Sequence, residues 1–217
     1  MTAYRCLILD LDGTVVDSHA YTFAAFRHAC APFRTPPGDA RIYAAFGPDE
    51  SIILRSLVGA THAAEAYRRL QEYYAAHVDS LVVHAEMRAL LGDCARGGIR
   101  RGLFTGRGSD STRLILSRLH LEHCFEAVVA GDTVRQPKPA ADGVVGLLRE
   151  LGCAPSEAVV VGDSVLDVEA ARRAGTSAAL ATWFTCAVTR ADSTAPQLER
   201  PDALRPLLGL PSRAAGG

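Results

Sequence analysis

Five short apolar segments, separated by helical patterns, limit what this chain can fold into more than any other feature. They cover residues 4–10, 99–105, 127–131, 158–163 and 176–182. Between the later segments, residues 110–120 carry apolar side chains at helical spacing, and so do residues 139–151, which open with Pro139 in a first turn and end before Gly152. Strands that alternate with helices predict a parallel sheet covered on both faces. We therefore expect an α/β fold.

The segment from residue 18 to residue 83 interrupts this alternation, because it shows helical periodicity and no convincing strand. Apolar or aromatic side chains recur every three or four residues at Ala63, Tyr67, Leu70, Tyr74 and Val78. Residues 48–50 begin a further helix, which Gly59 closes. We expect a small helical cap domain over residues 18–83, inserted after the first strand into a core of residues 1–17 and 84–217.

Composition narrows the class of partner. The chain has 217 residues, 48% of them hydrophobic, which is enough for a substantial core. Its formal net charge of -1 gives no overall attraction to nucleic acid or to anionic lipid. We therefore expect a small-molecule partner, no nucleic acid and no membrane, and either a monomer or a homodimer.

Cysteine usage and hydropathy indicate the compartment. The six cysteines lie far apart without any C-x-x-C pair, so we expect them to be reduced. The apolar run before Asp10 is too short for a signal peptide, and no segment offers about 18 uncharged apolar residues for a membrane span. These features predict a cytoplasmic protein.

The stretch LILDLDGTVVDS, residues 7–18, places Asp10 and Asp12 two positions apart at the end of the first predicted strand. Strand side chains alternate, so this spacing directs both acids to the same side. Two neighbouring carboxylates repel each other unless a cation or a proton offsets the repulsion. The stretch therefore predicts a site that binds a positive group.

Other polar residues follow the remaining predicted strands. Ligands of parallel sheets bind where the carboxyl ends of the strands converge. That edge is predicted to hold, besides the two acids, Thr105 and Gly106, then Gly162, Asp163 and Ser164, with Lys138 in a nearby loop. Carboxylate oxygens suit a hard cation such as Mg²⁺, which also accepts an oxygen from a substrate phosphate. We expect Asp10 and Asp163 to be its carboxylate ligands.

These residue types match the needs of phosphoryl transfer. A carboxylate can attack phosphorus directly, and Asp10 is the candidate nucleophile. The Thr105 hydroxyl, the Gly106 N–H and Lys138 would hold the phosphoryl oxygens. Asp12 would protonate the leaving oxygen and later deprotonate the attacking water.

The segment VVVGDSVLDVEAARRAG, residues 159–175, carries a further acid at the start of a predicted helix. Ser164 can cap this helix and Gly175 can close it. Asp167 would contact the metal indirectly, fix Lys138 through a charged hydrogen bond, or serve as a first-turn acid that the helix dipole favours. These three readings are compatible with one another.

Four motifs in this order resemble the haloacid dehalogenase superfamily of aspartate-nucleophile phosphatases. They are DLDGT, LFTGR, QPKPAADG and GDSVLDVEAARRAG, and the resemblance covers nearly the whole chain. The resemblance implies a Rossmann-like core, a helical cap between the first two motifs, bound Mg²⁺ and a phosphatase cycle through an aspartyl-phosphate. In this resemblance the backbone carbonyl of Asp12 joins Asp10 and Asp163 as a metal ligand.

The subgroup that the chain resembles is that of phosphoglycolate phosphatases, with their pyrophosphatase relatives. The segment FGPDES, residues 46–51, looks like the short Gly-Pro segment of those pyrophosphatases, whereas TGR stands where many relatives have T-N-K. His19, Gly47 and Arg107 are the candidate substrate contacts. We expect a small phosphomonoester substrate, such as phosphoglycolate or a sugar phosphate.

Four other functions compete with this prediction. A phosphosugar mutase or an inorganic pyrophosphatase of the same superfamily would use the same core motifs. A phospho-signalling receiver also combines acids, Thr, Lys and Mg²⁺ on a parallel sheet, but its phosphorylated Asp would follow the third strand. A ligand-binding module that retains the site without turnover is the remaining alternative.

Overall fold

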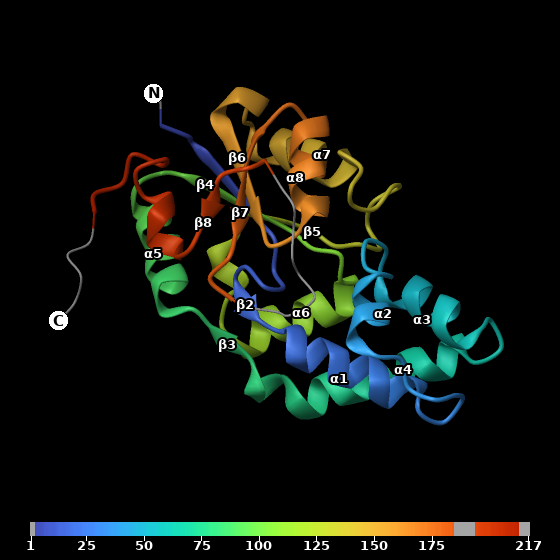
Figure 1. The fold of residues 1–217 in the computed structure, drawn as a ribbon. Helices are drawn as coiled ribbons and strands as arrows, with labels where there is room; N and C mark the ends of the chain where they lie inside the picture. The colour runs from blue at the N-terminus through green and yellow to red at the C-terminus, as the bar shows by residue number, and fades with distance from the viewer. Residues whose placement is uncertain (1–2, 185–193, 213–217) are drawn as a thin grey trace.

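The computed structural model describes residues 3–184 and 194–212, and it contains a six-stranded parallel sheet (Figure 1). The strand order is β5-β4-β1-β6-β7-β8, and every neighbouring pair in it is parallel. The strands are β1 (Cys6–Leu9), β4 (Arg100–Phe104), β5 (Ala127–Val129), β6 (Ala158–Gly162), β7 (Ser177–Ala181) and β8 (Gln197–Leu198). The α/β fold class predicted from the sequence is confirmed, and β1 lies near the centre of the sheet.

Helices cover both faces of this sheet. The side chains of β1 alternate between two hydrophobic clusters, with Leu7 and Leu9 in one and Cys6 and Ile8 in the other. The first cluster includes apolar residues of α5 (Ala85–Arg96) and α6 (Ser109–Arg118), and the second includes those of α7 (Asp142–Leu151) and α8 (Val165–Arg173). Both faces of the central strand are therefore buried, which explains its unbroken apolar sequence. The described part of the chain also contains four short 3₁₀ helices, η1 (Val78–Ser80), η2 (Glu122–Cys124), η3 (Pro155–Glu157) and η4 (Pro201–Leu204).

Four helices form a separate group below the carboxyl end of the sheet in Figure 1. They are α1 (His19–Cys30), α2 (Asp39–Tyr43), α3 (Glu50–Val58) and α4 (Ala63–His77). The rings of Tyr21 on α1 and Tyr74 on α4 stack with their centroids 4.9 Å apart. We call these four helices the cap. The division into a core of residues 1–17 and 84–217 and a cap domain of residues 18–83 stays a prediction.

The expectation that residues 18–83 contain no strand is wrong at one point. Strand β3 (Val82–Val83) pairs antiparallel with β2 (Val16–Asp17), so that the two chain segments leading into and out of the cap lie side by side. A strand of two residues shows no periodicity, which is why the sequence pattern did not reveal this pair.

Helix α7 begins later than predicted. It starts at Asp142, so Pro139 lies in the preceding loop, while Gly152 ends the helix in the left-handed conformation with φ of 67°. Cys6, Cys30, Cys94, Cys124 and Cys153 are free thiols, and Cys186 lies outside the described residues. Among the described residues, no helix has both the length and the apolar character needed to cross a bilayer.

Candidate active site

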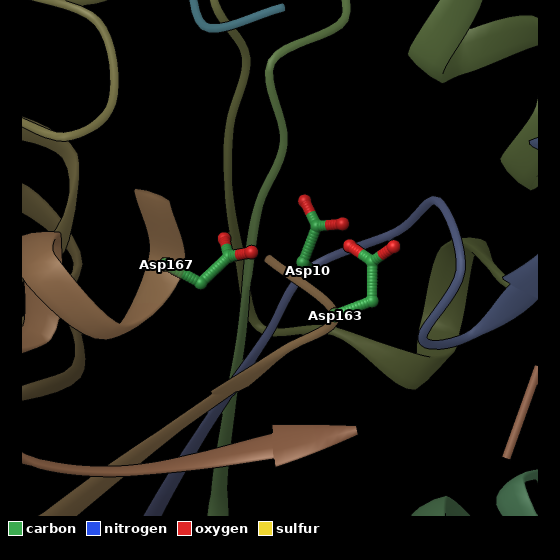
Figure 2. A group of neighbouring side chains, drawn as sticks. All are labelled: Asp10, Asp163 and Asp167. Carbon is green, nitrogen blue, oxygen red and sulfur yellow. The ribbon is translucent and has the colours of Figure 1, made fainter. Parts of the chain in front are cut away.

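Three carboxylates converge where two central strands end. Asp10 directly follows β1, Asp163 directly follows β6, and Asp167 lies in the first turn of α8. Strands β1 and β6 are parallel neighbours with Leu9 opposite Val161, so their carboxyl ends meet. Each of the three acids offers an oxygen within 4.8 Å of the others, and Figure 2 shows how the side chains approach one another. We call Asp10, Asp163 and Asp167 the acid cluster.

Lys138 neutralises part of this negative charge. Its Nζ lies 2.6 Å from Asp10 Oδ1, 2.6 Å from Asp167 Oδ1 and 2.6 Å from the Phe104 carbonyl oxygen. Burial opposes the charged form of the lysine, but the two carboxylates outweigh burial and raise its pKa. Its single positive charge is shared by Asp10 and Asp167, so Lys138 does not balance all three carboxylates by itself.

The chemistry of the acid cluster fits a divalent cation. Burial raises the pKa of Asp10, and the neighbouring acids raise it further against the opposing effect of Lys138. A hard cation that accepts carboxylate oxygens would relieve this crowding, and Mg²⁺ prefers such ligands. The Nε2 atom of His19 lies 3.1 Å from Asp163 Oδ2.

The tight turn after Asp12 requires a glycine. Gly13 has φ of 67°, a conformation that L residues rarely adopt, and a Cβ there would collide with the Asp163 carboxylate and the His19 ring. The D-x-D-G motif thus allows the loop after β1 to approach the loop after β6.

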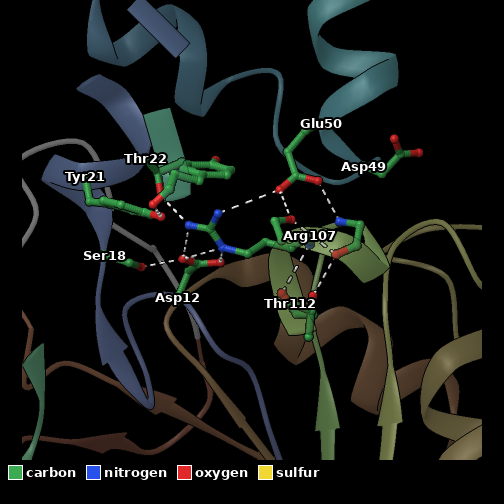
Figure 3. A network of polar contacts seen from close by, with 12 residues as sticks. Asp12, Ser18, Tyr21, Thr22, Asp49, Glu50, Arg107 and Thr112 are labelled. Atoms are coloured by element: carbon green, nitrogen blue, oxygen red, sulfur yellow. Dashed lines mark hydrogen bonds and ion pairs between the residues drawn. The ribbon is translucent and has the colours of Figure 1, made fainter. Parts of the chain in front are cut away.

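Asp12 follows the same strand as Asp10, but its positively charged partner is Arg107 rather than Lys138. Its Oδ2 accepts a hydrogen bond from Arg107 Nε at 2.8 Å and its Oδ1 accepts one from Arg107 Nη2 at 2.7 Å, while the Ser18 hydroxyl also donates to Oδ1 (Figure 3). Burial favours the neutral acid, but Arg107 and Ser18 outweigh it, so the pKa of Asp12 is lowered. These hydrogen bonds therefore favour the ionised form of Asp12, which can accept a proton.

Arg107 is surrounded by cap residues. Besides Asp12, its Nη2 donates to Thr22 Oγ1 at 2.5 Å, and its guanidinium carbon lies 4.7 Å from the ring centroid of Tyr74. Its Nη1 is buried without a hydrogen-bond partner among the described residues, and Glu50 Oε1 lies 3.7 Å from it. We call Thr22, Glu50, Tyr74 and Arg107 the arginine subsite.

A cavity of about 260 Å³ joins the acid cluster to the arginine subsite. Phe26, Phe46 and Ile53 of the cap contribute an apolar wall. An apolar wall with a few polar groups is typical of a small-molecule site, in which the polar groups fix the orientation of the ligand.

The structure brings most of the predicted site residues to this cavity. The lining residues that the sequence nominated are Asp10, Asp12, His19, Gly47, Gly106, Arg107, Lys138, Asp163 and Asp167. Thr105 is not among the described residues that line it: the side chain is fully buried, and its Oγ1 accepts a hydrogen bond from the Arg107 backbone N–H at 3.1 Å. A role for the Thr105 hydroxyl in holding phosphate stays a prediction.

Sequence reasoning did not identify Glu50, Thr22 or Tyr74 as site residues. Tyr74 was assigned to cap packing by its helical spacing, and its ring does stack on Tyr21. Glu50 lies in FGPDES, three residues after the nominated Gly47, and its place in that segment is a signal that could have pointed to it.

Comparisons with known proteins agree with this geometry. A family model described as haloacid dehalogenase-like hydrolase matches residues 7–181. The chain is 33% identical to the phosphoglycolate phosphatase of Rhodospirillum rubrum over 187 residues, which cover 79% of this chain and 76% of that protein. It is 29% identical to pyrophosphatase PpaX of Bacillus velezensis over 191 residues, which cover 82% of each.

The fold is shared with solved structures. A crystal structure titled as a putative phosphoglycolate phosphatase from Lactobacillus plantarum superposes with a TM-score of 0.80 at 20% identity. The match covers 95% of this chain and 100% of the other. At this identity the likeness establishes the arrangement of sheet, covering helices and cap.

Proposed function

Because this chain belongs to the haloacid dehalogenase-like hydrolase family, we propose that it is a Mg²⁺-dependent phosphatase. It would hydrolyse a small organic phosphomonoester through an aspartyl-phosphate intermediate. The observation that carries this proposal is the convergence of three carboxylate oxygens within 4.8 Å of one another, beside the Nζ of Lys138.

The metal would be held by the carboxylates of Asp10 and Asp163 and by the backbone carbonyl of Asp12. Asp167 would act through Lys138, since its Oδ1 accepts from Nζ at 2.6 Å while its Oδ2 accepts from the Ser164 hydroxyl at 2.6 Å. Bound Mg²⁺ supplies positive charge that offsets the negative charge of the acid cluster and of the substrate phosphate.

In the first half of the reaction, a carboxylate oxygen of Asp10 attacks phosphorus. The new O–P bond forms as the bond to the leaving oxygen breaks, and the departing oxygen takes a proton from Asp12. Asp12 must therefore take up a proton from solvent before this half begins, and the ionised form that Arg107 and Ser18 favour corresponds to the state after the alcohol has left. The Gly106 N–H would donate to a phosphoryl oxygen, while Lys138 would attract the phosphoryl oxygens through its charge and orient Asp10 through its hydrogen bond.

In the second half, water attacks the phosphorus of the aspartyl-phosphate and releases inorganic phosphate. Asp12 accepts the proton of that water, and the structure holds it in the form that can do so, because Arg107 and Ser18 donate to its carboxylate. The apolar wall of the cap limits the access of bulk water to the phosphoenzyme.

Phosphate release from a panel of phosphomonoesters and pyrophosphate, measured with Mg²⁺, tests this proposal. Asp10→Asn should abolish release, because the amide is not a nucleophile toward phosphorus. Asp12→Asn should accumulate a phosphoenzyme that intact mass spectrometry detects, because the attacking water has lost its base. Normal turnover by the Asp10 variant would contradict the proposed mechanism.

The same panel separates the competing enzymes. Preferred release from pyrophosphate would identify a pyrophosphatase, and a requirement for a bisphosphate activator would identify a mutase. A receiver-like or binding module would release no phosphate from any compound.

A further inference from the structure

We propose that the cavity selects phosphomonoesters whose leaving group is uncharged and carries a hydroxyl, and that it disfavours a leaving group with a carboxylate. The inference rests on the proposed phosphatase function and adds the class of substrate to it. It follows from the charges and the free hydrogen-bonding groups of the arginine subsite.

The arginine subsite is where the leaving group would lie. Asp12 is the residue assigned to the leaving oxygen, and Arg107 binds Asp12 from the cap side of the cavity. Thr22 and Tyr74 lie on cap helices and contact the same guanidinium. A fragment attached to the phosphate at the acid cluster would therefore extend toward these residues.

Among the described residues, no positive charge in the arginine subsite is left over for a second anion. The single charge of Arg107 faces two carboxylates, Asp12 through a two-point hydrogen-bonded pair and Glu50 at 3.7 Å. The other cationic residues that line the cavity, Lys138 and His19, contact the acid cluster. A substrate carboxylate in this buried space would meet an excess of negative charge, which is costly at low dielectric.

The unpaired groups suit a hydroxyl instead. Arg107 Nη1 and the Tyr74 hydroxyl are both buried and lack a hydrogen-bond partner among the described residues, and both residues line the cavity. Glu50 offers acceptor oxygens beside them. A hydroxyl accepts from one group and donates to another, so it can satisfy a mixed set of donors and acceptors that a carboxylate cannot. A site built this way rejects analogues that lack the matching group.

Glu50 is held as a fixed acceptor. Its Oε2 accepts from the Gly108 N–H at 2.6 Å and its Oε1 accepts from the Ser111 hydroxyl at 2.5 Å (Figure 3). Its side chain is 4% exposed. These bonds keep the carboxylate beside Arg107, so its charge cannot swing out of the subsite when a ligand enters.

A matched pair of esters tests the inference. Phosphoglycolate and 2-hydroxyethyl phosphate have the same carbon skeleton and differ only in a carboxylate against a hydroxymethyl group. We would measure the binding of each by calorimetry with Mg²⁺, using the Asp10→Asn variant so that neither ester is turned over. The expected result is binding of 2-hydroxyethyl phosphate at least about tenfold tighter than that of phosphoglycolate.

The second measurement adds Glu50→Gln to that background. This substitution removes the excess charge at constant size, so we expect phosphoglycolate to bind more tightly. The ratio of the Kd of phosphoglycolate to the Kd of 2-hydroxyethyl phosphate should then fall at least about fivefold. Asp49→Asn is the control, because it removes the same charge one residue away. Asp49 caps α3 and points away from Arg107 in Figure 3. Asparagine can also cap a helix, so this substitution should keep α3 intact. The control should leave the ratio unchanged.

Tyr74→Phe provides an independent check, since it keeps the ring on Arg107 and removes only the unpaired hydroxyl. It should weaken the binding of 2-hydroxyethyl phosphate and leave that of phosphoglycolate unchanged. The inference is overturned if phosphoglycolate binds as tightly as its partner ester or more so, if neither ester binds, or if both Glu50→Gln and Tyr74→Phe leave the ratio unchanged. Failure of the native chain to release phosphate from any ester would overturn the proposed function instead.

Discussion

At the scale of single residues, the site depends on a few buried charges that neutralise one another. Lys138 is 7% exposed and bonds to two acids and a carbonyl, so all three of its N–H donors have partners. Removing one partner of a buried pair leaves the other charge without compensation, and that loss outweighs the modest net benefit of the intact pair.

Lys138→Ala is therefore expected to destabilise the protein by about 3–5 kcal/mol and to abolish turnover. Urea unfolding at neutral pH, without added Mg²⁺, measures the change in the free energy of unfolding. Arg135→Ala is the control, because Arg135 is exposed in the same loop. This substitution should change the free energy of unfolding by no more than about 0.5 kcal/mol. If the Lys138 variant were as stable as the wild type, the buried acids would not depend on the lysine to compensate their charge.

The sequence nominated the individual acids and Lys138 because residue type and strand-end position were enough to suggest their chemistry. It also offered the pair of Lys138 and Asp167, which the structure contains, but it did not predict the partner of Asp12. Arg107 and Asp12 are 95 residues apart, and nothing in local spacing indicates that the Arg107 guanidinium holds Asp12. Such pairing depends on how the loops of neighbouring strands meet in the folded chain.

At the scale of elements, the N-terminus of α3 connects the cap to the core. Asp49 caps its own helix by accepting from the Ser51 N–H at 2.9 Å. Glu50 instead accepts from Gly108 and Ser111 at the start of α6, where the helix dipole also favours a negative charge. The two adjacent acids thus have different roles: Asp49 stabilises a helix within the cap, and Glu50 links the cap to α6.

Burial of Glu50 should make stability depend on pH in a defined direction. Burial raises the pKa of Glu50, although Arg107, Ser111 and Gly108 oppose the effect. The folded protein then binds this proton more tightly than the unfolded chain, so stability falls as pH rises from the ordinary value of 4.5 through the raised one. Glu50→Gln should lose this contribution. Urea unfolding across that pH range would show the free energy of unfolding of the wild type falling relative to that of the variant. Parallel pH profiles would contradict the prediction.

The elements that the sequence predicted best are those with a long, regular pattern. The five predicted strands all occur, because each carries buried apolar residues that stand out in the sequence. The pairs β2–β3 and β7–β8 were missed because β2, β3 and β8 have two residues each and carry no periodicity. The late start of α7 was also missed, since Pro139 suits a first helical turn but here belongs to the loop that carries Lys138.

At the scale of the whole molecule, metal binding should join parts of the chain that are distant in sequence. The acid cluster draws on the end of β1, the end of β6 and the first turn of α8. A ligand that binds only the folded state stabilises it, by about 2.7 kcal/mol at a concentration one hundred times its Kd. The loop after Asp12 has a built-in reporter, because Trp183, the single tryptophan of the chain, donates from Nε1 to the Thr14 carbonyl at 2.8 Å.

Titration with Mg²⁺ should therefore raise the Tm and produce a saturable change in Trp183 fluorescence, with both effects reporting the same Kd. Asp163→Asn removes a ligand and should weaken both effects together by at least about tenfold in Kd. Asp110→Asn is the matched control, because Asp110 is an exposed acid in the first turn of α6, outside the cavity lining, and its titration should follow wild type. Equal Mg²⁺ responses in the Asp163 variant and in wild type would show that the cation binds elsewhere, since loss of a carboxylate from the acid cluster cannot leave its affinity unchanged.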